Sequence, residues 1–268
     1  MQLTGVAGWP ISHSRSPQLH RAAFEDLGLA GWESQQLPIP PDVFEETVRA
    51  LPGNGFVGIN VTIPHKEAAL ALADVATEAA VAVGAANTLT FSSDGSVTAA
   101  NTDSPAIQAV VEEHAARDGL PSSALVLGAG GSARAAIHAL RASGVPHVAV
   151  WNRNVERAQS LVDSFEGTDL ADSPEGFELL LNATPVGLVE GTSPADVGLG
   201  GQFPKECKIL IDLVYADGGT GLELVASESG VAFVDGLEIL VRQGALSVEI
   251  WTGKRPSLEP LRLAVGSA

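Results

Sequence analysis

Apolar residues along this chain fall into two repeating patterns. Short runs such as residues 124–127 and 148–151 are continuously apolar, which is typical of strands buried on both faces of a sheet. They alternate with segments whose apolar residues recur every three or four positions, and this spacing predicts helices with one apolar face. The alternation predicts an α/β protein. Strands are expected at residues 3–7, 56–63, 87–91, 124–127, 148–151, 179–182, 209–214 and 231–234.

Several expected helices begin at residues with a recognisable role. Ser16 is a good N-cap and Pro17 suits the first helical position. Pro41 opens a second helix, and Pro105 opens a helix that we take as the crossover into a second domain. A helix is also expected from 155 to 165. A long one should follow Asp235-Gly236, and a short last one from Pro256 should pack back on the first domain.

A glycine turn follows the strand at 124–127. Gly128, Gly130 and Ala133 form the pattern G-x-G-x-x-A between that strand and a helix with an apolar face. The first glycine permits a tight bend, the second lets a pyrophosphate approach the backbone, and the small third residue lets helix and strand pack closely. Free N–H groups at the helix start would face the phosphates. The turn therefore predicts a Rossmann-type dinucleotide site.

The end of the next strand indicates which dinucleotide is bound. An NAD site places a carboxylate on the ribose roughly 20 residues after the glycines, but this chain has Asn152-Arg153-Asn154 there. Arg153 and Arg157 offer guanidinium groups to a 2′-phosphate. NADP is the expected cofactor, although both arginines could simply solvate a helix start. Residues 186–204 are rich in Gly and Pro and are expected to form a mobile loop on the cofactor side.

Composition and charge exclude several classes of function. The net charge of −17 over 268 residues argues against a nucleic acid or an anionic membrane as partner. A single cysteine, Cys207, excludes an internal disulfide and a cysteine-based zinc cluster. The N-terminal residues lack the pattern of a signal peptide, and no long apolar run occurs. A cytoplasmic protein with a small-molecule substrate is expected, as a monomer or a homodimer.

A second group of polar residues stands at the predicted strand ends. Ser14 and Ser16 place two hydroxyl groups at the start of a predicted helix, where they suit a carboxylate or hydroxyl ligand. Lys66 follows the strand at 56–63. Asp94-Gly95 predicts a hairpin turn, which brings Asn87, Asn101 and Asp103 to the open end of the hairpin. Each residue alone has an ordinary structural explanation. A polar cluster assembled from several strand ends is hard to explain as packing, and it predicts a ligand site.

Nine short motifs stand in order along the chain. They are Ser12-His-Ser-Arg-Ser-Pro17, Asn60-Val-Thr-Ile-Pro-His-Lys66, Asn87-Thr88, Asn101-Thr-Asp103, Gly128-Ala-Gly-Gly131, Asn152-Arg153, Asn182-Ala-Thr184, Tyr215 and the segment from Asp235-Gly236 to Gln243. Any single motif is weak, but their order and spacing are specific, and through them the chain resembles the shikimate dehydrogenase family over nearly its whole length. The resemblance implies an N-terminal α/β substrate domain, residues 1–104 plus 236–268, and a Rossmann NADP domain, residues 105–235, with catalysis in the cleft between them.

The resemblance also implies the roles of individual residues. Lys66 and Asp103 are expected to be the catalytic pair in the NADPH-dependent reduction of 3-dehydroshikimate to shikimate, a step towards chorismate and the aromatic amino acids. Substrate binding is assigned to Ser14, Ser16, Thr62, Lys66, Asn87, Asp103, Tyr215 and Gln243. Cofactor binding is assigned to Gly128, Ala129, Gly130, Gly131, Ser132, Asn152, Arg153, Asn154, Arg157, Thr184, Leu213 and Gly236, with Glu78 as a weaker candidate. No metal ligand is expected.

The residue types agree with this chemistry. Reduction of a ketone needs a proton donor within hydrogen-bond reach of the developing alkoxide, and the ammonium of Lys66 can serve. Its charge also stabilises the negative oxygen as it forms. Asp103 would hold the ammonium in line, and the hydride belongs to the nicotinamide.

The sequence departs from the family pattern at four positions. Asn154 replaces a threonine next to Arg153, which puts the strength of the 2′-phosphate contact in question. Leu213 and Ile239 stand where methionine is common, and His65 stands where an aromatic residue is usual. The walls of the pocket are therefore expected to differ from those of typical members.

Three alternatives stay open on the sequence alone. The first keeps the fold but changes the substrate to quinate or an amino analogue, with broader substrate or NAD use. The second is a sensor that binds shikimate without turnover, against which the presence of both Lys66 and Asp103 argues. The third is a folate dehydrogenase of similar layout, which would need a pterin-stacking aromatic residue; the chain has one tyrosine and no obvious stacking pair.

Overall fold

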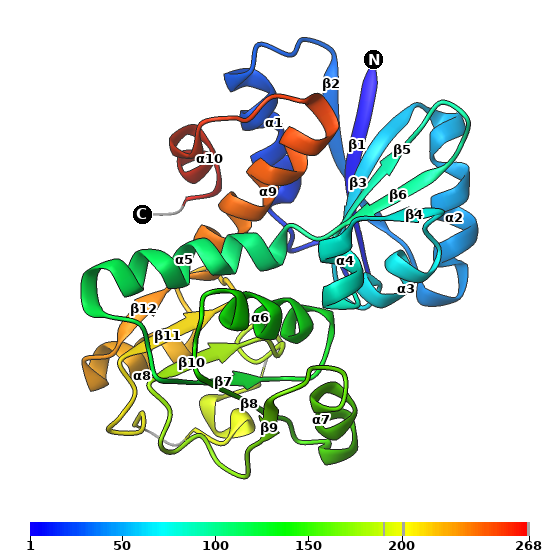
Figure 1. Cartoon of the computed structure of the whole chain (residues 1–268). Helices are drawn as coiled ribbons and strands as arrows, with labels where there is room; N and C mark the ends of the chain where they lie inside the picture. Colours follow the sequence, from blue (N-terminus) through cyan, green and yellow to red (C-terminus); the bar gives the residue numbers. More distant parts are fainter. Residues whose placement is uncertain (190, 200–201, 267–268) are drawn as a thin grey trace. The chain divides into compact units, whose positions relative to one another are not determined.

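The computed structural model describes residues 1–189, 191–199 and 202–266. The chain forms two compact units: unit 1 comprises Met1–Pro105 and Leu240–Ala268, and unit 2 comprises Ala106–Ile239. Each unit contains a six-stranded sheet, drawn with its helices in Figure 1. The sequence places the boundaries after residues 104 and 235, whereas the contacts place them after Pro105 and Ile239. Within the described residues, no helix has both the length and the apolar character needed to span a bilayer.

The sheet of unit 1 is mixed, with strand order β2-β1-β3-β5-β6-β4. Strand β1 pairs in parallel with β2 and β3, while β5 runs antiparallel to β3 and β6. The β5–β6 hairpin turns where predicted: Gly95 has a φ of +86°, and the Asp94 carboxylate accepts the Ser96 N–H at 2.9 Å. The strands are β1 Gln2–Gly8, β2 Trp32–Pro38, β3 Phe56–Val61, β4 Val75–Ala76, β5 Thr88–Phe91 and β6 Val97–Ala100.

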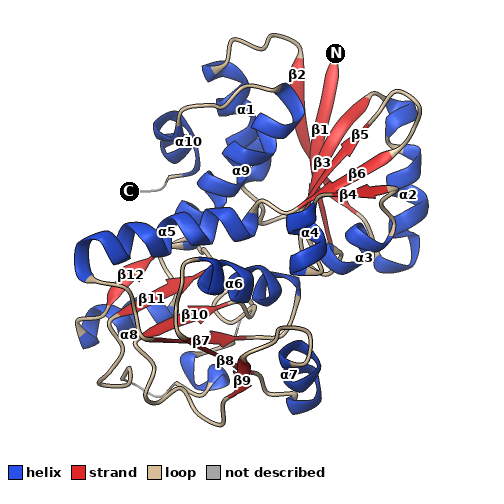
Figure 2. Cartoon of the chain, in the orientation of Figure 1, coloured by secondary structure: helices blue, strands red, loops and turns tan. Residues whose placement is uncertain are grey.

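Helices cover both faces of this sheet, as Figure 2 shows in blue against the red strands. On one face Ile59, Val61 and Leu89 pack with residues of α2 and α3. On the other face lie α1 and residues 240–252 of α9, and the Trp251 indole N–H donates to the Leu89 carbonyl at 3.1 Å, while α10 packs against α1. A side chain at Gly58 would collide with that indole. The helices are α1 Ser16–Asp26, α2 Phe44–Ala50, α3 Lys66–Ala71, α4 Glu78–Val83, α9 Gly236–Thr252 and α10 Leu258–Val265.

The sheet of unit 2 is entirely parallel, with order β12-β11-β10-β7-β8-β9. Counted within the unit, this is the 3-2-1-4-5-6 order of the doubly wound dinucleotide-binding fold, with its switch point between β7 and β10. The predicted α/β fold with a Rossmann-type domain is confirmed. The strands are β7 Ser123–Leu127, β8 His147–Trp151, β9 Thr168–Leu170, β10 Leu179–Asn182, β11 Ile209–Asp212 and β12 Ala232–Val234.

Both faces of the parallel sheet are buried, which explains why its strands are continuously apolar. Along β7, Ala124 and Val126 pack with α5 and α6, while Leu125 and Leu127 face a second cluster that includes α8. Cys207 belongs to this second cluster, and burial raises the pKa of its thiol to about 12. The helices of this part are α5 Asp103–Asp118, α6 Gly131–Ala142, α7 Val155–Val162 and α8 Gly221–Ser229.

The sequence missed four short or weakly patterned elements. Strand β2 lies at the edge of its sheet and buries Ser34 alone among its residues. Its residues are therefore mostly polar and do not show the alternation of apolar and polar positions that predicts a strand. Strands β4 and β9 span two and three residues, too few to show a period. Helix α4 spans six residues and is capped by Thr77, whose hydroxyl accepts the Ala80 N–H at 3.2 Å.

The prediction that Ser16 is the N-cap of the first helix is wrong. Helix α1 begins at Ser16, with Arg15 at the N-cap position, and the Ser16 side chain makes no capping bond. The hydroxyl that accepts the Ser16 N–H, at 3.3 Å, is that of Ser14. The hydroxyl of Ser14, and not that of Ser16, therefore accepts a backbone N–H at the start of α1, while Ser16 itself is buried.

Other element boundaries shift for similar reasons. Helix α5 begins at Asp103 rather than Pro105, because the Asn101 side chain accepts the Ser104 N–H at 3.0 Å. Strand β11 ends at Asp212, whose carboxylate accepts the Val214 N–H at 3.0 Å and turns the chain. The second helix opens with a 3-10 turn at Pro41–Val43. Strand β3 ends at Val61, α7 at Val162, and α10 begins at Leu258.

The Gly- and Pro-rich segment 186–204 is more ordered than the predicted mobile loop in the parts that the structure describes. It contains the 3-10 helix Pro194–Val197, in which the Ser193 and Asp196 side chains form a capping box. Val186, Val197 and Leu199 are buried against the sheet of unit 2. Residues 190, 200 and 201 of this segment lie outside the described residues.

Candidate active site

Polar residues collect at one edge of the unit 1 sheet. The parallel strands β1 and β3 end there, and the antiparallel hairpin β5–β6 starts and finishes there, because Thr88 pairs with both Asn60 and Ala100. The loops that leave these strands therefore meet at the same edge. They carry the predicted substrate and catalytic residues Ser14, Ser16, Thr62, Lys66, Asn87 and Asp103.

Lys66 and Asp103 form a largely buried ion pair at this edge. Lys66 is the first residue of α3 and Asp103 the first residue of α5. The Lys66 Nζ donates to Asp103 Oδ2 at 2.8 Å, and the two side chains are 11% and 12% exposed. A carboxylate at a helix N-terminus is also stabilised by the helix dipole. The pair thus holds one ammonium group in a defined place with little access to water.

Asn87 ties the carboxylate to the neighbouring elements. Its side-chain oxygen accepts the Thr102 N–H at 2.7 Å, so its Nδ2 must be the donor on the other side. That nitrogen lies 2.8 Å from Asp103 Oδ1 and 3.2 Å from Gln243 Oε1 of α9. Asn87 therefore fixes one carboxylate oxygen of Asp103 while Lys66 occupies the other. Gln243 is brought to the same cluster, although it lies 140 residues further along the chain.

The two serines form a separate polar pair after β1. Ser14 Oγ lies 3.2 Å from Ser16 Oγ. Thr62 follows the adjacent strand β3, and a side chain at Gly8 would meet Thr62 Cγ2 at 2.6 Å, so glycine at this position lets the two strand ends approach. Three hydroxyls thus stand on neighbouring strand ends, where they can bind the hydroxyl or carboxylate groups of a small ligand.

Behind this edge runs a buried polar network, and the sequence assigned no site role to its members His20, Asn60 and Ser247. The Asn60 Nδ2 lies 2.9 Å from the Asn87 carbonyl and 2.8 Å from Ser247 Oγ. His20 lies behind Asn60 and is fully buried. An asparagine inside an apolar strand, and a histidine on the apolar face of α1, were the available signals. Thr88, Thr102 and Ser34 complete the network.

His65 takes the place of the aromatic residue expected before Lys66. Its ring stacks on Phe44 with centroids 4.1 Å apart and planes 8° apart. Its Nε2 lies 2.7 Å from the Ile39 carbonyl, which can only accept, so Nε2 carries the proton. Burial lowers the pKa of His65. The histidine thus keeps the stacking of an aromatic ring and adds a tether at the residue that precedes Lys66.

In unit 2, the glycine turn has the geometry of a pyrophosphate site. Gly128 directly follows β7 with a φ of +118°, and a side chain there would meet the Ala183 carbonyl oxygen at 3.0 Å. Gly130 stands at the N-cap of α6, and a side chain on it would enter open space. The N-terminus of this 12-residue helix can donate N–H groups to an anion in that space. The residues present therefore fit a dinucleotide.

The next βα loop holds the predicted 2′-phosphate residues. Asn154 caps α7, because its side-chain oxygen accepts the Arg157 N–H at 2.7 Å. Asn152 Nδ2 donates to the Asn154 carbonyl at 2.9 Å. The Arg153 side chain is 76% exposed, with its Nη1 3.9 Å from Asp196 Oδ1, and Arg157 is also exposed. Asn154 thus serves as a helix cap, and both guanidinium groups are accessible to an anion.

Asp212 is a buried carboxylate at the end of β11. Its Oδ1 accepts from Asn182 Nδ2 at 2.8 Å and from the Val214 N–H at 3.0 Å, and its Oδ2 accepts from the Thr220 hydroxyl at 2.9 Å. Burial raises its pKa to about 6, against the lowering effect of these bonds. Asn182 in turn accepts the Thr184 hydroxyl at 2.6 Å. Asp212 therefore joins the loops after β10 and β11 to the start of α8.

The remaining predicted site residues divide between the units. Leu213, Tyr215 and Gly236 belong to unit 2, where a side chain at Gly236 would collide with the Val214 carbonyl, at 2.6 Å. Glu78 is an exposed residue in the first turn of α4 in unit 1. Ala129, Gly131 and Ser132 are partly buried around the glycine turn. Among the described residues, no cluster of three His, Cys, Asp or Glu side chains could hold a metal ion.

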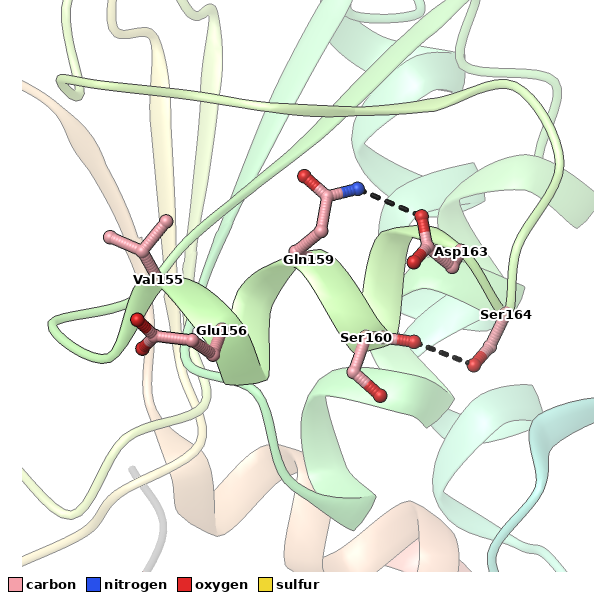
Figure 3. Close-up of a pocket in the computed structure, with 6 residues that line it drawn as sticks. All are labelled: Val155, Glu156, Gln159, Ser160, Asp163 and Ser164. Atoms are coloured by element: carbon pink, nitrogen blue, oxygen red, sulfur yellow. Dashed lines mark hydrogen bonds between the residues drawn. The ribbon is translucent and has the colours of Figure 1, made fainter.

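A surface hollow beside α7, drawn in Figure 3, is a different feature. Its polar groups pair along the helix, since Gln159 donates to Asp163 at 2.8 Å and the Ser164 hydroxyl to the Ser160 carbonyl at 2.8 Å. Glu156 is the other charged residue that lines it. Two carboxylates and no basic side chain line this hollow, so it does not suit the phosphates of a nucleotide.

The fold and these two sites define the class of protein. A parallel sheet with a glycine turn at its switch point binds dinucleotides, and unit 1 supplies a buried ammonium group held by a carboxylate. The chain is a two-domain α/β protein of the dinucleotide-dependent dehydrogenase class.

Comparison with known proteins identifies the family. The model described as shikimate dehydrogenase substrate binding domain matches residues 6–89, the shikimate / quinate 5-dehydrogenase model matches residues 110–181, and the shikimate 5'-dehydrogenase C-terminal domain model matches residues 236–265. The chain belongs to the shikimate dehydrogenase family, as the resemblance predicted.

Individual relatives align with this chain over nearly its full length. Shikimate dehydrogenase (NADP(+)) of Paracoccus denitrificans is 42% identical over 98% of this chain and 95% of its own. Shikimate 5-dehydrogenase from Thermus thermophilus, solved with NADP(H) and shikimate, is 34% identical, with a TM-score of 0.84 over 99% of both chains. Quinate dehydrogenase from Corynebacterium glutamicum, solved with NAD, is 27% identical, with a TM-score of 0.84 over 100% of this chain and 99% of that one. The fold is thus shared by members with different substrates and cofactors.

Proposed function

We propose that this chain catalyses the reversible NADPH-dependent reduction of 3-dehydroshikimate to shikimate, in the pathway to chorismate and the aromatic amino acids. The observation that carries the proposal is the buried Lys66–Asp103 pair, 2.8 Å between Nζ and Oδ2, at the polar edge of unit 1. Membership of the shikimate dehydrogenase family supports the substrate class. The proposed substrate domain, residues 1–104 plus 236–268, contains this edge, and the biosynthetic role makes a cytoplasmic location the natural one.

In this mechanism Lys66 is the general acid of the reduction. As hydride reaches the carbonyl carbon, the oxygen gains negative charge, and the ammonium both stabilises that charge and donates a proton to it. Asp103 keeps the ammonium in place through the charge-assisted bond to Nζ. In the oxidation of shikimate the neutral amine accepts the hydroxyl proton. When bound, NADPH supplies the hydride from its nicotinamide ring.

The polyhydroxylated ring would be oriented by the polar residues around the pair. Ser14, Ser16 and Thr62 offer hydroxyl groups at the strand ends, which suit a carboxylate or hydroxyl ligand. Asn87 and Gln243 offer amides, with Asn87 already hydrogen-bonded to Asp103 at 2.8 Å. Tyr215 of unit 2 is the remaining proposed contact.

For the cofactor, the residues of unit 2 fit NADP. The proposed site combines Gly128 to Ser132 at the pyrophosphate with Asn152, Arg153, Asn154, Arg157 and Thr184 around the adenosine half, and Leu213, Gly236 and Glu78 as further candidates. Arg153 is central, because β8 ends without the carboxylate that would select NAD. Its exposed guanidinium group can bind a 2′-phosphate in bidentate fashion.

The test is a four-way comparison of kcat/KM, with shikimate or quinate as substrate and NADP or NAD as cofactor. Shikimate with NADP should give the highest value. The Arg153→Ala variant should lose kcat/KM with NADP but change little with NAD, since the guanidinium group meets only the 2′-phosphate. A wild-type enzyme that prefers NAD, or an Arg153→Ala variant that loses both cofactors equally, would contradict the assignment of Arg153.

Quinate with NAD is the second candidate. It is favoured by the TM-score of 0.84 to quinate dehydrogenase in complex with NAD, equal to that for the Thermus enzyme. The same four-way comparison separates the two candidates. A sensor without turnover would show binding of shikimate but no product in any of the four combinations.

A further inference from the structure

His20 is a fully buried histidine that the proposed mechanism does not use. It lies in the middle of α1, with its ring 5.2 Å from that of Trp251 in an edge-to-face arrangement at 86°. Its Nδ1 lies 2.8 Å from Ser34 Oγ and its Nε2 lies 2.9 Å from Asn60 Oδ1. Burial lowers its pKa to about 4, so the ring is neutral near neutral pH. A polar ring in this place needs both nitrogens satisfied.

The hydrogen bonds around His20 determine its tautomer. Asn60 must turn its Nδ2 towards the Asn87 carbonyl, 2.9 Å away, because a carbonyl can only accept. The Asn60 Oδ1 therefore faces His20 and needs a donor. In the neutral ring this donor is Nε2–H, and Nδ1 accepts from the Ser34 hydroxyl.

The same assignment of donors and acceptors extends from Asn60 to the Lys66–Asp103 pair. The Asn87 carbonyl accepts from Asn60 and from the Val61 N–H, at 2.9 and 2.8 Å, which fixes its backbone. The Asn87 side chain then donates to Asp103 Oδ1 at 2.8 Å. Lys66 occupies the other oxygen of that carboxylate. Counted over the whole residue, each member of the series from His20 to Asp103 is at most 9% exposed, and the Asp103 side chain is 12% exposed, so water has little access to these bonds.

We propose that His20 is a positioning residue for the Lys66–Asp103 pair. It acts through Asn60 and Asn87: the Nε2–H donor fixes the orientation of the Asn60 amide, and this amide fixes the turn that carries Asn87. The inference rests on the proposed function only for the catalytic consequence. The tautomer and the series of bonds stand on the geometry alone.

Two substitutions of His20 separate the donor to Asn60 from the mere presence of a polar group. In His20→Gln the terminal amide reaches about as far as Nε2 and can donate to Asn60. In His20→Asn the shorter amide reaches only the Nδ1 position, so it can meet Ser34 and leaves Asn60 Oδ1 unpaired. Phe24→Leu is the control, since Phe24 is buried one turn further along α1 and packs on Trp32.

For His20→Asn we expect kcat for shikimate oxidation to fall about 10- to 100-fold, the scale of a small displacement of a catalytic group. KM should change little and the pH profile of kcat should shift. His20→Gln should keep kcat within about threefold of wild type. Phe24→Leu should lower the melting temperature while leaving kcat and its pH profile unchanged. If His20→Asn behaves like Phe24→Leu, or if His20→Gln falls as far as His20→Asn, His20 has a structural role only and the proposal is overturned.

A second readout does not depend on turnover. In protein labelled with ¹⁵N at histidine, His20 should show a protonated Nε2 and an unprotonated Nδ1. In protein labelled at asparagine, the side-chain amide signals of Asn87 should shift in His20→Asn and stay near wild type in His20→Gln. A reversed tautomer, or Asn87 signals unaffected by His20→Asn, would overturn the proposal. Wild-type protein that shows these signals but turns over neither shikimate nor quinate would instead overturn the proposed function.

Discussion

The two candidate sites differ in the kind of group that forms them. At the edge of unit 1 the site is made of side chains, and several of them are oriented by partners far away in the sequence, as Asn87 and Gln243 show. At the switch point of unit 2 the site is made of backbone, shaped by two glycines and a helix N-terminus within a few residues. The first site should therefore be sensitive to loss of a functional group, and the second to addition of a side chain.

The largest effect is expected at Lys66. Lys66→Ala removes the proton donor, so kcat should fall at least ~10²-fold, the low end of general acid–base contributions. Shikimate binding should persist, because the surrounding hydroxyl and amide groups remain. Steady-state kinetics and calorimetry of shikimate binding check both statements, with the exposed Lys254→Ala as the control. Turnover close to wild type would remove Lys66 from the mechanism.

The next effect concerns stability at Asp212. Its pKa is raised from 3.8 to about 6 in the folded protein, so the native state binds more protons than the unfolded state between these values. Below pH 3.8 the carboxyl is protonated in both states, and its favourable contribution to the free energy of unfolding is fully present. This contribution, about 3 kcal/mol, is lost as pH rises through about 6.

Asp212→Asn removes this titration but keeps an acceptor for Asn182 and Val214. Its free energy of unfolding, relative to wild type, should rise by about 2 kcal/mol as pH increases from about 4 to 7, because part of the total change lies below pH 4. Urea denaturation at several pH values measures this difference. A pH-independent difference would show that the carboxylate is already charged, or already neutral, throughout the range.

A pair of glycine substitutions tests the backbone site. Gly130→Ala adds a methyl group to open space in an extended conformation, so the fold should be unaffected, while Kd for NADP should rise about tenfold through steric exclusion of the pyrophosphate. Gly128→Ala strains a φ of +118° and should lower stability by about 1–3 kcal/mol. Thermal denaturation and fluorescence titration with NADPH distinguish the two. Equal Kd values for Gly130→Ala and wild type would place the pyrophosphate elsewhere.

The smallest effect is expected at His65. His65→Phe keeps the stacking on Phe44 but removes the donor to the Ile39 carbonyl. The free energy of unfolding should fall by about 1 kcal/mol, the net value of one hydrogen bond, and kcat should stay close to wild type. His65→Ala, which also loses the stacking, should cost more. If the two variants are equally stable, the stacked ring contributes nothing.

The comparison also explains what the sequence could predict. The parallel strands and the glycine turn of unit 2 are encoded within short segments, so the apolar runs and the G-x-G-x-x-A pattern predicted its Rossmann-type fold correctly. The assignment of the turn and of the two arginines to the cofactor stays a prediction. Strand 179–182 was predicted to the residue. The hairpin at Asp94-Gly95 was equally local and was confirmed.

The predictions that failed concern features that the pattern of apolar and polar residues does not determine. The sequence could not assign the cap of α1, because Ser14 and Ser16 have the same chemistry and only the fold shows which hydroxyl accepts the N–H. His20 and Asn60 are separated by 40 residues and meet only after α1 packs on the sheet. Strand β2 was missed because an edge strand buries little and needs no apolar period.

The burial of Cys207 has a practical consequence for future measurements. The chain has no other cysteine, and a thiol whose pKa is near 12 is almost entirely in its unreactive protonated form at neutral pH. A cysteine introduced on the surface would then be the one group in the protein that takes up a maleimide dye or spin label. Pairs of such labels, one in each unit, can report distances during turnover without first removing the native residue.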